Sequence, residues 1–365
     1  MLGRRYQLTV LAVTAVAFVG PAQGGHLAAA PSWRMVAEHH DAHGHVVGLD
    51  LLTSGRSTPR LLVRWHSIDG WSFPRMSPDG FHVAYVFYTS HRPGRNGLYV
   101  VDLGRGKPQR VAAGNARNIA WSPDSTEIAF SGQSSGKRPG IFVVSSTGGA
   151  ARRVFPANGF PNWSPDGRQI VCSCGFREEV WVFSSDGEGA RRLAGPVPRK
   201  VAAAAVFGVT GASWSPDGRL IAFGRNCYLI EIVSDIWCEP AVMDPDGKNK
   251  RTVRKETTFF AGYPPVWSSP GSMLLQTWRL RAKPVMSLNV RTGARRVFYA
   301  VRSTVYQYAL WASTRHTAFA TVDGTKLVLL DPSGRVLGKR RLPRPLVFKY
   351  GYFPFNGDVW LGETR

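Results

Sequence analysis

The sequence predicts an all-β protein, a β-propeller of four-stranded antiparallel blades. Three observations lead to this fold class. A short unit of strand, tight turn and strand recurs along the chain, each copy is followed by a second pair of strands, and the distance between copies suits four strands with their connections. The copies begin at Met76, Trp121, Trp163, Trp214, Trp267 and Trp311, at spacings of 45, 42, 51, 53 and 44 residues.

The copy that starts at Trp214 shows how the unit works. Trp214 is a large apolar anchor at the end of a strand. Pro216 presets the backbone for the first central position of a turn, Asp217 accepts hydrogen bonds from nearby backbone amides, and Gly218 takes the positive φ that other residues resist. The apolar segment 220–223 then returns as the second strand. We interpret Asp217 as a turn residue and not as a catalytic one.

A third and a fourth strand follow each unit. The third strands are short apolar segments such as 98–102 and 141–144, and the fourth strands begin with basic residues. Arginine pairs stand at 152–153, 191–192, 295–296 and 340–341. A fourth strand forms the outer edge of its blade, where charge discourages pairing with another sheet. We interpret these arginines as solvated edge protection.

The complete cycle resembles the TolB-type β-propeller repeat. It runs from Trp-Ser-Pro-Asp-Gly-Arg through Ile-Ala-Phe, a Tyr-Val-Val-Asp-type strand and Gly-Gly to Arg-Arg-Leu. The resemblance covers residues 46–365 and is strongest in the copies at Trp121, Trp163 and Trp214. It implies a propeller that acts in the periplasm, near the envelope, with protein partners.

TolB-type propellers also resemble the lid domain of prolyl-oligopeptidase-like hydrolases. We expect a binding protein rather than an enzyme, because no hydrolase domain accompanies the repeats and no H-E-x-x-H zinc motif or P-loop occurs. A propeller hydrolase or lyase can assemble its site from scattered residues at the channel mouth, so an enzyme is the alternative. The sequence identifies no catalytic residue, no cofactor and no metal site.

The two ends of the repeat region predict one more blade. Residues 350–355 and 358–361 read as two strands joined by an Asn356-Gly357 hairpin. Residues 46–50 and 61–65 read as a third and a fourth strand that no Trp-Ser-Pro-Asp unit precedes. A blade formed half from each end would close the ring and remove its open edges. We therefore expect seven blades, and six blades with the C-terminal hairpin outside the ring is the alternative.

Residues 1–30 have the order of a secretory signal. Two arginines precede an apolar run over 8–19 that is too short to span a bilayer comfortably, and small residues follow. We expect cleavage and a secreted or periplasmic protein of the cell envelope, with a retained N-terminal anchor as the alternative. The mature chain then has no transmembrane span. It begins with a His-rich flexible segment over 31–45, whose alternative role is metal binding, and continues as a single propeller domain over 46–365.

Four cysteines support an oxidising compartment, because an even number after a leader indicates disulfides. Cys227 and Cys238 flank a short insertion between two strands, and we expect a disulfide that closes it. Cys172 and Cys174 lie two positions apart on one strand and point the same way, which makes a bridge between them awkward. Metal binding by this Cys-x-Cys pair is the alternative.

Ligands of propellers bind at the faces and at the mouth of the central channel. The Pro-Asp-Gly turns lie on one face, and the longer connections lie on the other, where we expect the ligand. Aromatic rings at a channel mouth suit sugars, peptides or apolar side chains, although rings also pack between blades. The candidate ligand-binding residues of this loop-rich face are Trp71, Phe73, Arg92, Asn118, Phe160, Asn162, Arg177, Arg225, Tyr263, Arg279, Tyr306 and Tyr308.

The charge of the chain points to the chemistry of its partner. Lys and Arg number 46 against 24 Asp and Glu, a formal net charge of +22. Such a charge attracts anionic partners, or alternatively serves only to keep the protein soluble. The basic residues are spread around the repeats and not gathered in one stripe, which argues against nucleic acid. We expect a monomeric, non-catalytic binding or scaffold module for a protein or an anionic envelope polymer.

Overall fold

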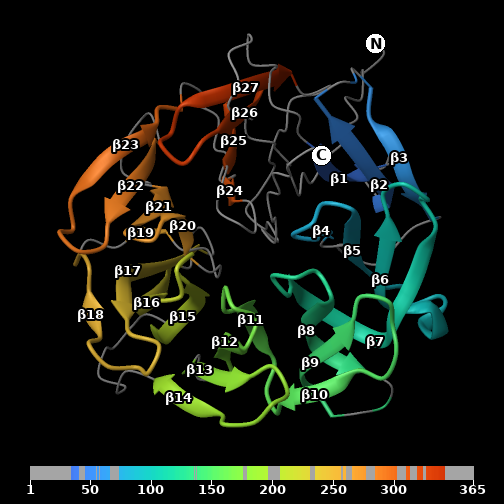
Figure 1. Ribbon diagram of the computed structural model, residues 1–365, viewed down its shortest axis with the longest axis horizontal. Coiled ribbons are helices and arrows are strands. Elements are labelled where there is room, and N and C mark those ends of the chain that lie inside the picture. The colour runs from blue at the N-terminus through green and yellow to red at the C-terminus, as the bar shows by residue number, and fades with distance from the viewer. Residues whose placement is uncertain are drawn as a thin grey trace, which may run out of the picture.

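The strands lie in five hydrogen-bonded sheets that are arranged as a ring (Figure 1). The computed structural model describes residues 34–40, 46–54, 56, 58–65, 74–134, 136, 138–175, 179–195, 206–230, 235–255, 258–259, 265–276, 284–301, 310–312, 319–323 and 326–341. Within these residues the one helix is the short 3-10 helix η1 (Pro93–Arg95). A search of the same residues finds no helix long and apolar enough to cross a membrane. The fold is an all-β propeller, as the sequence predicts.

The first half of the ring contains three sheets. The three-stranded sheet comprises β1 (Arg34–His40), β2 (Val46–Thr53) and β3 (Arg60–Arg64). The seven-stranded sheet comprises β4 (Arg75–Met76), β5 (His82–Phe87), β6 (Gly97–Asp102), β7 (Pro108–Trp121), β8 (Glu127–Ser134), β9 (Gly140–Ser145) and β10 (Arg152–Phe155). The next sheet comprises β11 (Gly159–Trp163), β12 (Gln169–Cys174), β13 (Glu179–Ser184) and β14 (Arg191–Ala194).

The second half contains two sheets. The nine-stranded sheet comprises β15 (Val206–Trp214), β16 (Ile221–Ile230), β17 (Asp235–Met243), β18 (Arg251–Thr252), β19 (Thr258–Phe259), β20 (Val266–Ser269), β21 (Ser272–Gln276), β22 (Val285–Asn289) and β23 (Arg295–Tyr299). The last sheet comprises β24 (Leu310–Ala312), β25 (Phe319–Asp323), β26 (Lys326–Leu330) and β27 (Val336–Arg341). The strands that belong to one copy of the repeat are called a blade below.

Strand β7 makes two blades continuous. Its residues 108–113 pair with β6, and its residues 114–121 pair with β8, so it is the fourth strand of one blade and the first strand of the next. In the nine-stranded sheet, β19 connects two blades in a similar way, because it pairs with both β17 and β21. Seven separate four-stranded sheets are therefore not seen. Backbone hydrogen bonds run across the connections between blades and merge neighbours into five sheets.

The N-terminal strands correct one expectation. Residues 34–40, placed by the sequence in a flexible segment, form β1, which pairs antiparallel with β2. The physical reason is that Met35 and Val36 are apolar. The structure buries both side chains fully. The first sheet thus takes three strands from the N-terminal side, one more than expected. The expected C-terminal hairpin at 350–361 lies outside the described residues.

The Ser-Pro-Asp-Gly turns have the predicted construction. In the copy at Trp163, the Ser164 hydroxyl donates to Oδ1 of Asp166 (2.6 Å) and accepts from the amide of Gln169 (2.9 Å). The amide of Gly167 donates to the Ser164 carbonyl oxygen (2.9 Å), and Gly167 has a φ of 72°. The same serine–aspartate bond recurs in the three other Ser-Pro-Asp copies. The aspartates of these turns are therefore part of the scaffold.

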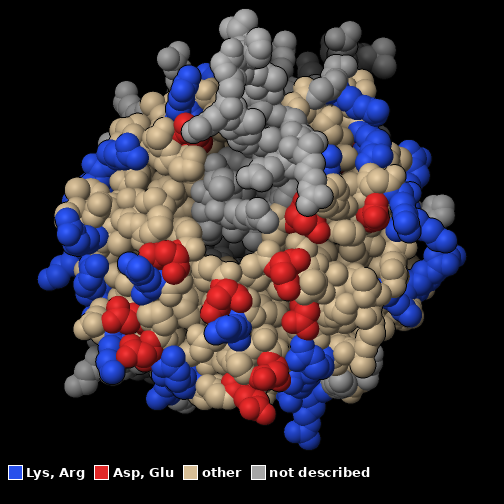
Figure 2. Space-filling model, viewed as in Figure 1, with Lys and Arg blue, Asp and Glu red and all other residues tan. Residues whose placement is uncertain are grey.

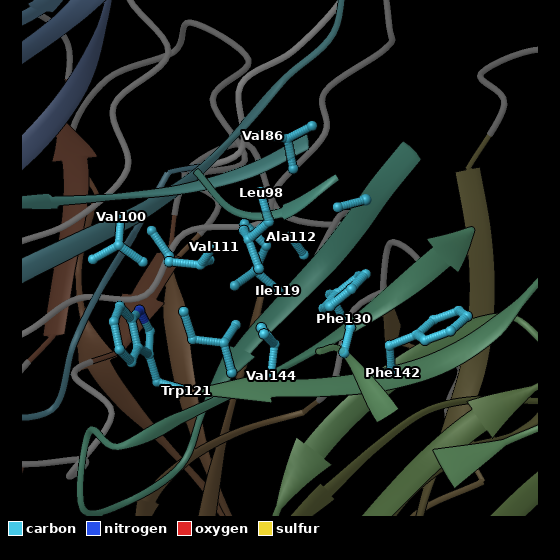
Figure 3. Close-up of a cluster of buried hydrophobic side chains, with 14 residues drawn as sticks. Val86, Leu98, Val100, Val111, Ala112, Ile119, Trp121, Phe130, Phe142 and Val144 are labelled. Carbon is cyan, nitrogen blue, oxygen red and sulfur yellow. The ribbon is translucent and has the colours of Figure 1, made fainter. Parts of the chain in front are cut away.

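Both faces of a blade are apolar because each faces a neighbouring blade. In β5, Val83 and Tyr85 belong to a core shared with β1, β2 and β3, whereas Ala84 and Val86 belong to a core shared with β8 and β9. Successive side chains of a strand point to opposite faces, so a sheet covered on both sides needs apolar residues at consecutive positions. Figure 3 shows the second core, which continues from β5 and β6 through Ile119 of β7 to β8 and β9.

The basic residues that begin the outer strands reach the next blade. Arg152 donates to the carbonyl oxygen of Ser185 at 3.3 Å, and Arg191 donates to that of Pro245 at 2.9 Å. Gln109 makes the same kind of bond one blade earlier. Each acceptor lies in the turn between the third and fourth strands of the following blade. The expectation of mere edge protection is therefore incomplete, since these long side chains also connect neighbouring blades.

Candidate functional site

The residues expected at the ligand face divide into two groups. Arg92, Asn118, Phe160, Asn162 and Arg225 are described by the structure. Trp71, Phe73, Arg177, Tyr263, Arg279, Tyr306 and Tyr308 lie outside the described residues. Among the first group, Arg92 and Arg225 are exposed and Phe160 is half-buried. Arg92 precedes η1 and Arg225 belongs to β16, and these two elements lie on different sides of the ring (Figure 1).

The two asparagines have a structural role. The side-chain amide of Asn118, in β7, donates to the carbonyl oxygen of Gly159 in β11 at 2.9 Å. The side-chain oxygen of Asn162, in β11, accepts from the backbone amide of Trp214 in β15 at 3.0 Å. Each bond joins one blade to the next. We therefore assign both side chains to the scaffold, although the sequence suggested a ligand-binding role.

Three arginines surround η1, in the connection between β5 and β6, and form what we call the arginine patch: Arg92, Arg95 and Arg110. Arg92 precedes η1, Arg95 ends it, and Arg110 of β7 donates to the carbonyl oxygen of Gly94 at 2.6 Å. All three side chains are exposed. Arg152, Arg192 and Arg219 form ion pairs with carboxylates, whereas none is seen for the three side chains of the patch among the described residues. The patch therefore presents guanidinium charge that no described carboxylate balances.

The backbone beneath the arginine patch is fixed by buried polar contacts. The amide of Thr89 donates to the side-chain oxygen of Asn96 at 2.8 Å, and both residues are buried. Gly97 leaves room for Arg110, since a Cβ at this position would lie 3.0 Å from Cδ of Arg110. The backbone that carries these arginines is thus fixed before any ligand arrives, which lowers the entropic cost of binding.

The surface charge is unevenly distributed over the visible face of the ring. In Figure 2, Lys and Arg follow the outer edge and gather beside β3, β7 and η1, while many Asp and Glu side chains lie further in. Eleven of the 24 acidic residues belong to the turns between first and second or third and fourth strands, or to the residues beside them: Asp79, Asp102, Asp124, Glu127, Asp166, Asp186, Glu188, Asp217, Asp244, Asp246 and Asp331. An anionic partner is consequently attracted to the outer edge.

A second cluster of titratable groups lies on the turn side of the ring. Nδ1 of His82 is 3.7 Å from Oδ2 of Asp79, and Nε2 of His82 is 3.9 Å from Oδ2 of Asp102. Both distances exceed a hydrogen bond, so these are ion-pair contacts. The indole of Trp121 also lies near the imidazole of His82, with ring centroids 6.5 Å apart. Sequence reasoning missed this cluster, because residues 79, 82 and 102 come from two different turns.

The three groups stabilise one another's charged forms. Asp79 raises the pKa of His82 above its usual value, against the opposing effect of partial burial. Partial burial opposes the ionisation of Asp79, but His82, the Ser77 hydroxyl and the Phe81 amide together hold the pKa of Asp79 below its usual value. The backbone amide of Arg105, assisted by that of Gly104, lowers the pKa of Asp102. The cluster is therefore an ion-pair network. Among the described residues, no group of three or more His, Cys, Asp or Glu side chains could hold a metal ion.

One segment of the chain has the spacing of a serine-hydrolase nucleophile elbow, Gly132-Gln-Ser-Ser-Gly136. A functional elbow places its serine, exposed, on a sharp turn between a strand and a helix. Here Ser134 is the buried last residue of β8, and the chain continues into strand β9. The match is a coincidence of spacing and does not define a catalytic serine.

Both cysteine pairs are bonded. Cys227 and Cys238 form a disulfide between β16 and β17, at a Cα–Cα distance of 4.1 Å. Cys172 and Cys174 are also paired, although their positions on β12 were expected to make a bridge awkward. Their Cα atoms are 5.5 Å apart, within the range that disulfides span. The described residues include no free cysteine, so the structure offers no thiol ligand to a metal there.

Comparison with known proteins identifies the repeat. Residues 66–226 match the family described as TolB beta propeller domain. A protein of Chlorobium chlorochromatii named as a TolB homologue is 35% identical over 102 residues, which are 27% of this chain and 22% of that protein. An uncharacterised protein of Agrobacterium fabrum is 29% identical over 180 residues, 46% of this chain and 55% of that protein. Over residues 66–226, the recurring unit of this chain matches the TolB-type β-propeller repeat.

The similar proteins also include enzymes. A Bacillus subtilis protein named as an uncharacterised peptidase is 29% identical over 117 residues, 29% of this chain and 17% of that protein. The structure of a puromycin-hydrolyzing peptidase from Mycobacterium tuberculosis has a TM-score of 0.59 at 16% identity, and the match covers 91% of this chain and 54% of that one. This likeness shows the propeller fold alone. The chain spans 17% to 55% of the length of these curated relatives.

Proposed function

We propose that this chain is a non-catalytic, monomeric TolB-like binding propeller of the periplasm or cell envelope. Its partner is an anionic polymer or an acidic protein surface, which docks on the loop-rich side at the outer edge. The observation that carries the proposal is the arginine patch, where three exposed guanidinium groups stand on a fixed backbone without a described carboxylate partner. Guanidinium groups match carboxylates and phosphates in geometry as well as charge.

Binding to an immobilised polyanion tests the proposal. The purified protein is applied to polyglutamate and phosphate-bearing resins at low salt, and the salt concentration for elution is measured. We expect retention that salt reverses, because exposed charge contacts are screened. The triple variant Arg92→Ala/Arg95→Ala/Arg110→Ala should elute at markedly lower salt.

A matched control removes the same charge elsewhere. The variant Arg105→Ala/Arg168→Ala/Arg219→Ala changes three arginines of the turn side, and Arg168 and Arg219 are as exposed as the patch. We expect it to elute close to the wild type. Equal losses in both triple variants would show that net charge alone governs retention, and no retention of the wild type at low salt would refute the proposed function.

A propeller enzyme is the second candidate. One observation favours it, the convergence of His82 with Asp79 and Asp102, and the peptidases among the similar proteins point the same way. The test is turnover of peptide, ester and glycoside reporter substrates by the wild type and by His82→Gln. Turnover that the substitution abolishes would establish the enzyme, whereas the binding proposal expects none above background.

We also propose a seventh blade that closes the ring. Support comes from the three-stranded sheet, where β1 occupies the inner position and the neighbouring blades have a further inner strand (Figure 1). The C-terminal residues 342–365 would supply that strand. Deleting them should lower the melting temperature of the whole domain. An unchanged melting temperature would favour six blades.

A further inference from the structure

Four aromatic rings meet in the seam between the three-stranded sheet and the blade of β4 to β7, and we call them the aromatic seam: Trp65, Tyr85, Phe87 and Tyr99. Trp65 and Tyr99 both stack with Tyr85, with centroids 5.4 and 5.5 Å away. Phe87 meets Trp65 and Tyr99 edge-on, at 5.9 and 6.0 Å. Tyr85 is buried, while the other three rings are half-buried. The seam therefore exposes ring surface on a rigid support.

The aromatic seam and the arginine patch are one continuous surface. Tyr99 of β6 lies directly opposite Arg110 of β7, on the same side of the sheet. The hydroxyl of Tyr99 donates to the carbonyl oxygen of Arg95 at 2.8 Å, in the last residue of η1. Rings and guanidinium groups are thus fixed side by side.

The next blade shows what packing alone requires. At the positions of Tyr85 and Tyr99 it has Phe130 and Phe142, which stack at 5.5 Å and are both almost fully buried. At the position of Phe87 it has Gly132. Two phenylalanines therefore suffice to fill a seam. The additional rings and the partial exposure of the aromatic seam therefore go beyond what the next blade uses to fill its seam.

We propose that the aromatic seam and the arginine patch together bind an acidic glycan, a chain of sugar rings that bears carboxylates or phosphates. The proposal rests on the proposed function and names the chemistry of the anion. A sugar ring presents C–H groups that pack on aromatic surface and hydroxyl groups that bond to polar neighbours. Its anionic substituents pair with guanidinium groups through two parallel hydrogen bonds. The two halves of the surface match these two properties.

The internal stacking of the rings disfavours a nucleic acid here. A nucleobase stacks on a free aromatic face. In the aromatic seam, Tyr85 is buried, and Trp65 and Tyr99 are each already stacked with it. The half-buried ring of Tyr99 lies beside a polar group, the guanidinium of Arg110. This mixed surface suits a non-planar ring that carries both C–H and O–H groups.

Calorimetric titration of the full chain tests the inference. The probes are alginate oligosaccharides, a phosphorylated mannan, neutral cello-oligosaccharides, polyglutamate and single-stranded DNA. We expect binding of one or both acidic glycans and none of the neutral glycan. The variant Arg95→Ala/Arg110→Ala should weaken that binding about tenfold, since an exposed charge pair contributes roughly threefold.

Further variants separate the aromatic contribution from charge and from folding. Phe87→Leu, which removes a half-buried ring of the aromatic seam and keeps an apolar side chain, should weaken glycan binding but leave retention on polyglutamate unchanged. Arg168→Ala/Arg219→Ala is the charge-matched control and should bind like the wild type. Melting curves of each variant show whether the fold is intact.

The outcomes distinguish this inference from the proposed function. If polyglutamate or DNA binds as tightly as the acidic glycans, and Phe87→Leu has no effect, the glycan site is wrong while an anion-binding propeller stands. If no anionic probe binds, both proposals fail. Binding of an acidic glycan that both the arginine and the phenylalanine variants weaken supports the site.

Discussion

The indole Nε1 of Trp163 donates a 3.0 Å hydrogen bond to the carbonyl oxygen of Ala120, in the preceding blade. The bond is repeated around the ring. Trp121 donates to the carbonyl oxygen of Arg75 at 3.1 Å, and Trp267 donates to the hydroxyl of Ser213 at 3.2 Å. The tryptophan of the repeat thus fills the seam with its ring and joins two blades with its one polar atom.

Replacing Trp163 with phenylalanine should cost more stability than the same change at Trp214. Both indoles are buried, but Nε1 of Trp214 has no hydrogen-bond partner among the described residues. The loss of ring volume is common to the two variants. Trp163→Phe therefore loses about 1 kcal/mol more, the net value of one hydrogen bond. Urea unfolding of the two variants measures the difference, and equal losses would show that the indole bond contributes nothing.

The serine of the Ser-Pro-Asp-Gly turn should contribute to the stability of the fold. Ser164→Ala removes the bond to Asp166 and the bond from the amide of Gln169. We expect a loss of about 1–2 kcal/mol, for two hydrogen bonds of roughly 1 kcal/mol each. Ser185→Ala, a half-buried serine in a neighbouring turn, is the control and should cost less. A similar loss in both, by chemical denaturation, would contradict the scaffold role of the turn serine.

The cluster at His82 should make stability depend on pH in a defined direction. Its raised pKa means that protonated His82 stabilises the fold below the usual value of 6.5, and that this contribution is lost as the pH rises through the raised value. The lowered pKa values of Asp79 and Asp102 make stability depend on pH in the opposite direction. Their contribution is present above the usual value of 3.8 and is lost as the pH falls through the lowered values.

Comparison of the wild type with His82→Gln measures this dependence. The wild type should be the more stable protein in mildly acidic buffer, where all three groups are charged, and the difference should shrink in alkaline buffer. Its size is below about 1 kcal/mol, because the side chains are more than a third exposed. A difference that does not change with pH would mean that the ion pairs are not formed in solution.

The disulfide between Cys227 and Cys238 should stabilise the fold through the unfolded chain. The two residues are 11 positions apart, and closing a loop of this length contributes about 2–4 kcal/mol. Cys227→Ala/Cys238→Ala should therefore lower the melting temperature by several degrees. Cys172→Ala/Cys174→Ala is the control, since its cysteines are 2 positions apart and constrain little chain entropy. The opposite order of effects would contradict this explanation.

The repeat made the fold predictable from the sequence. The copies at Trp121, Trp163 and Trp214 combine turn residues that each have one preferred conformation with short continuous runs of apolar residues, so strand, turn and strand follow from local chemistry. The continuity of β7 was not predictable. Residues 108–113 pair with β6, and residues 114–121 pair with β8 directly afterwards. The sequence does not show whether one strand continues through this point or two strands meet there.

The site was less predictable than the fold. Asn118 and Asn162 carry the same polar groups whether they bind a ligand or a neighbouring blade, and only the positions of Gly159 and Trp214 decide between the two. The sequence gives only a weak indication of the aromatic seam. Tyr85 and Phe87 are two positions apart, so their rings are expected on the same side of a strand. Their partner Trp65 comes from another blade, so the stack depends on tertiary packing that a single repeat does not encode.

The forward reach of the outer-strand side chains limits how this protein can change in length. The acceptors of Arg152 and Arg191 each lie in a turn that belongs to the next copy of the repeat. Duplication or loss of a complete copy leaves every such donor opposite an equivalent acceptor. Insertion or deletion of part of a copy separates a donor from its turn and displaces every seam beyond it. Evolution of such a chain therefore proceeds by gain and loss of whole copies, while the longer loops are free to vary within each one.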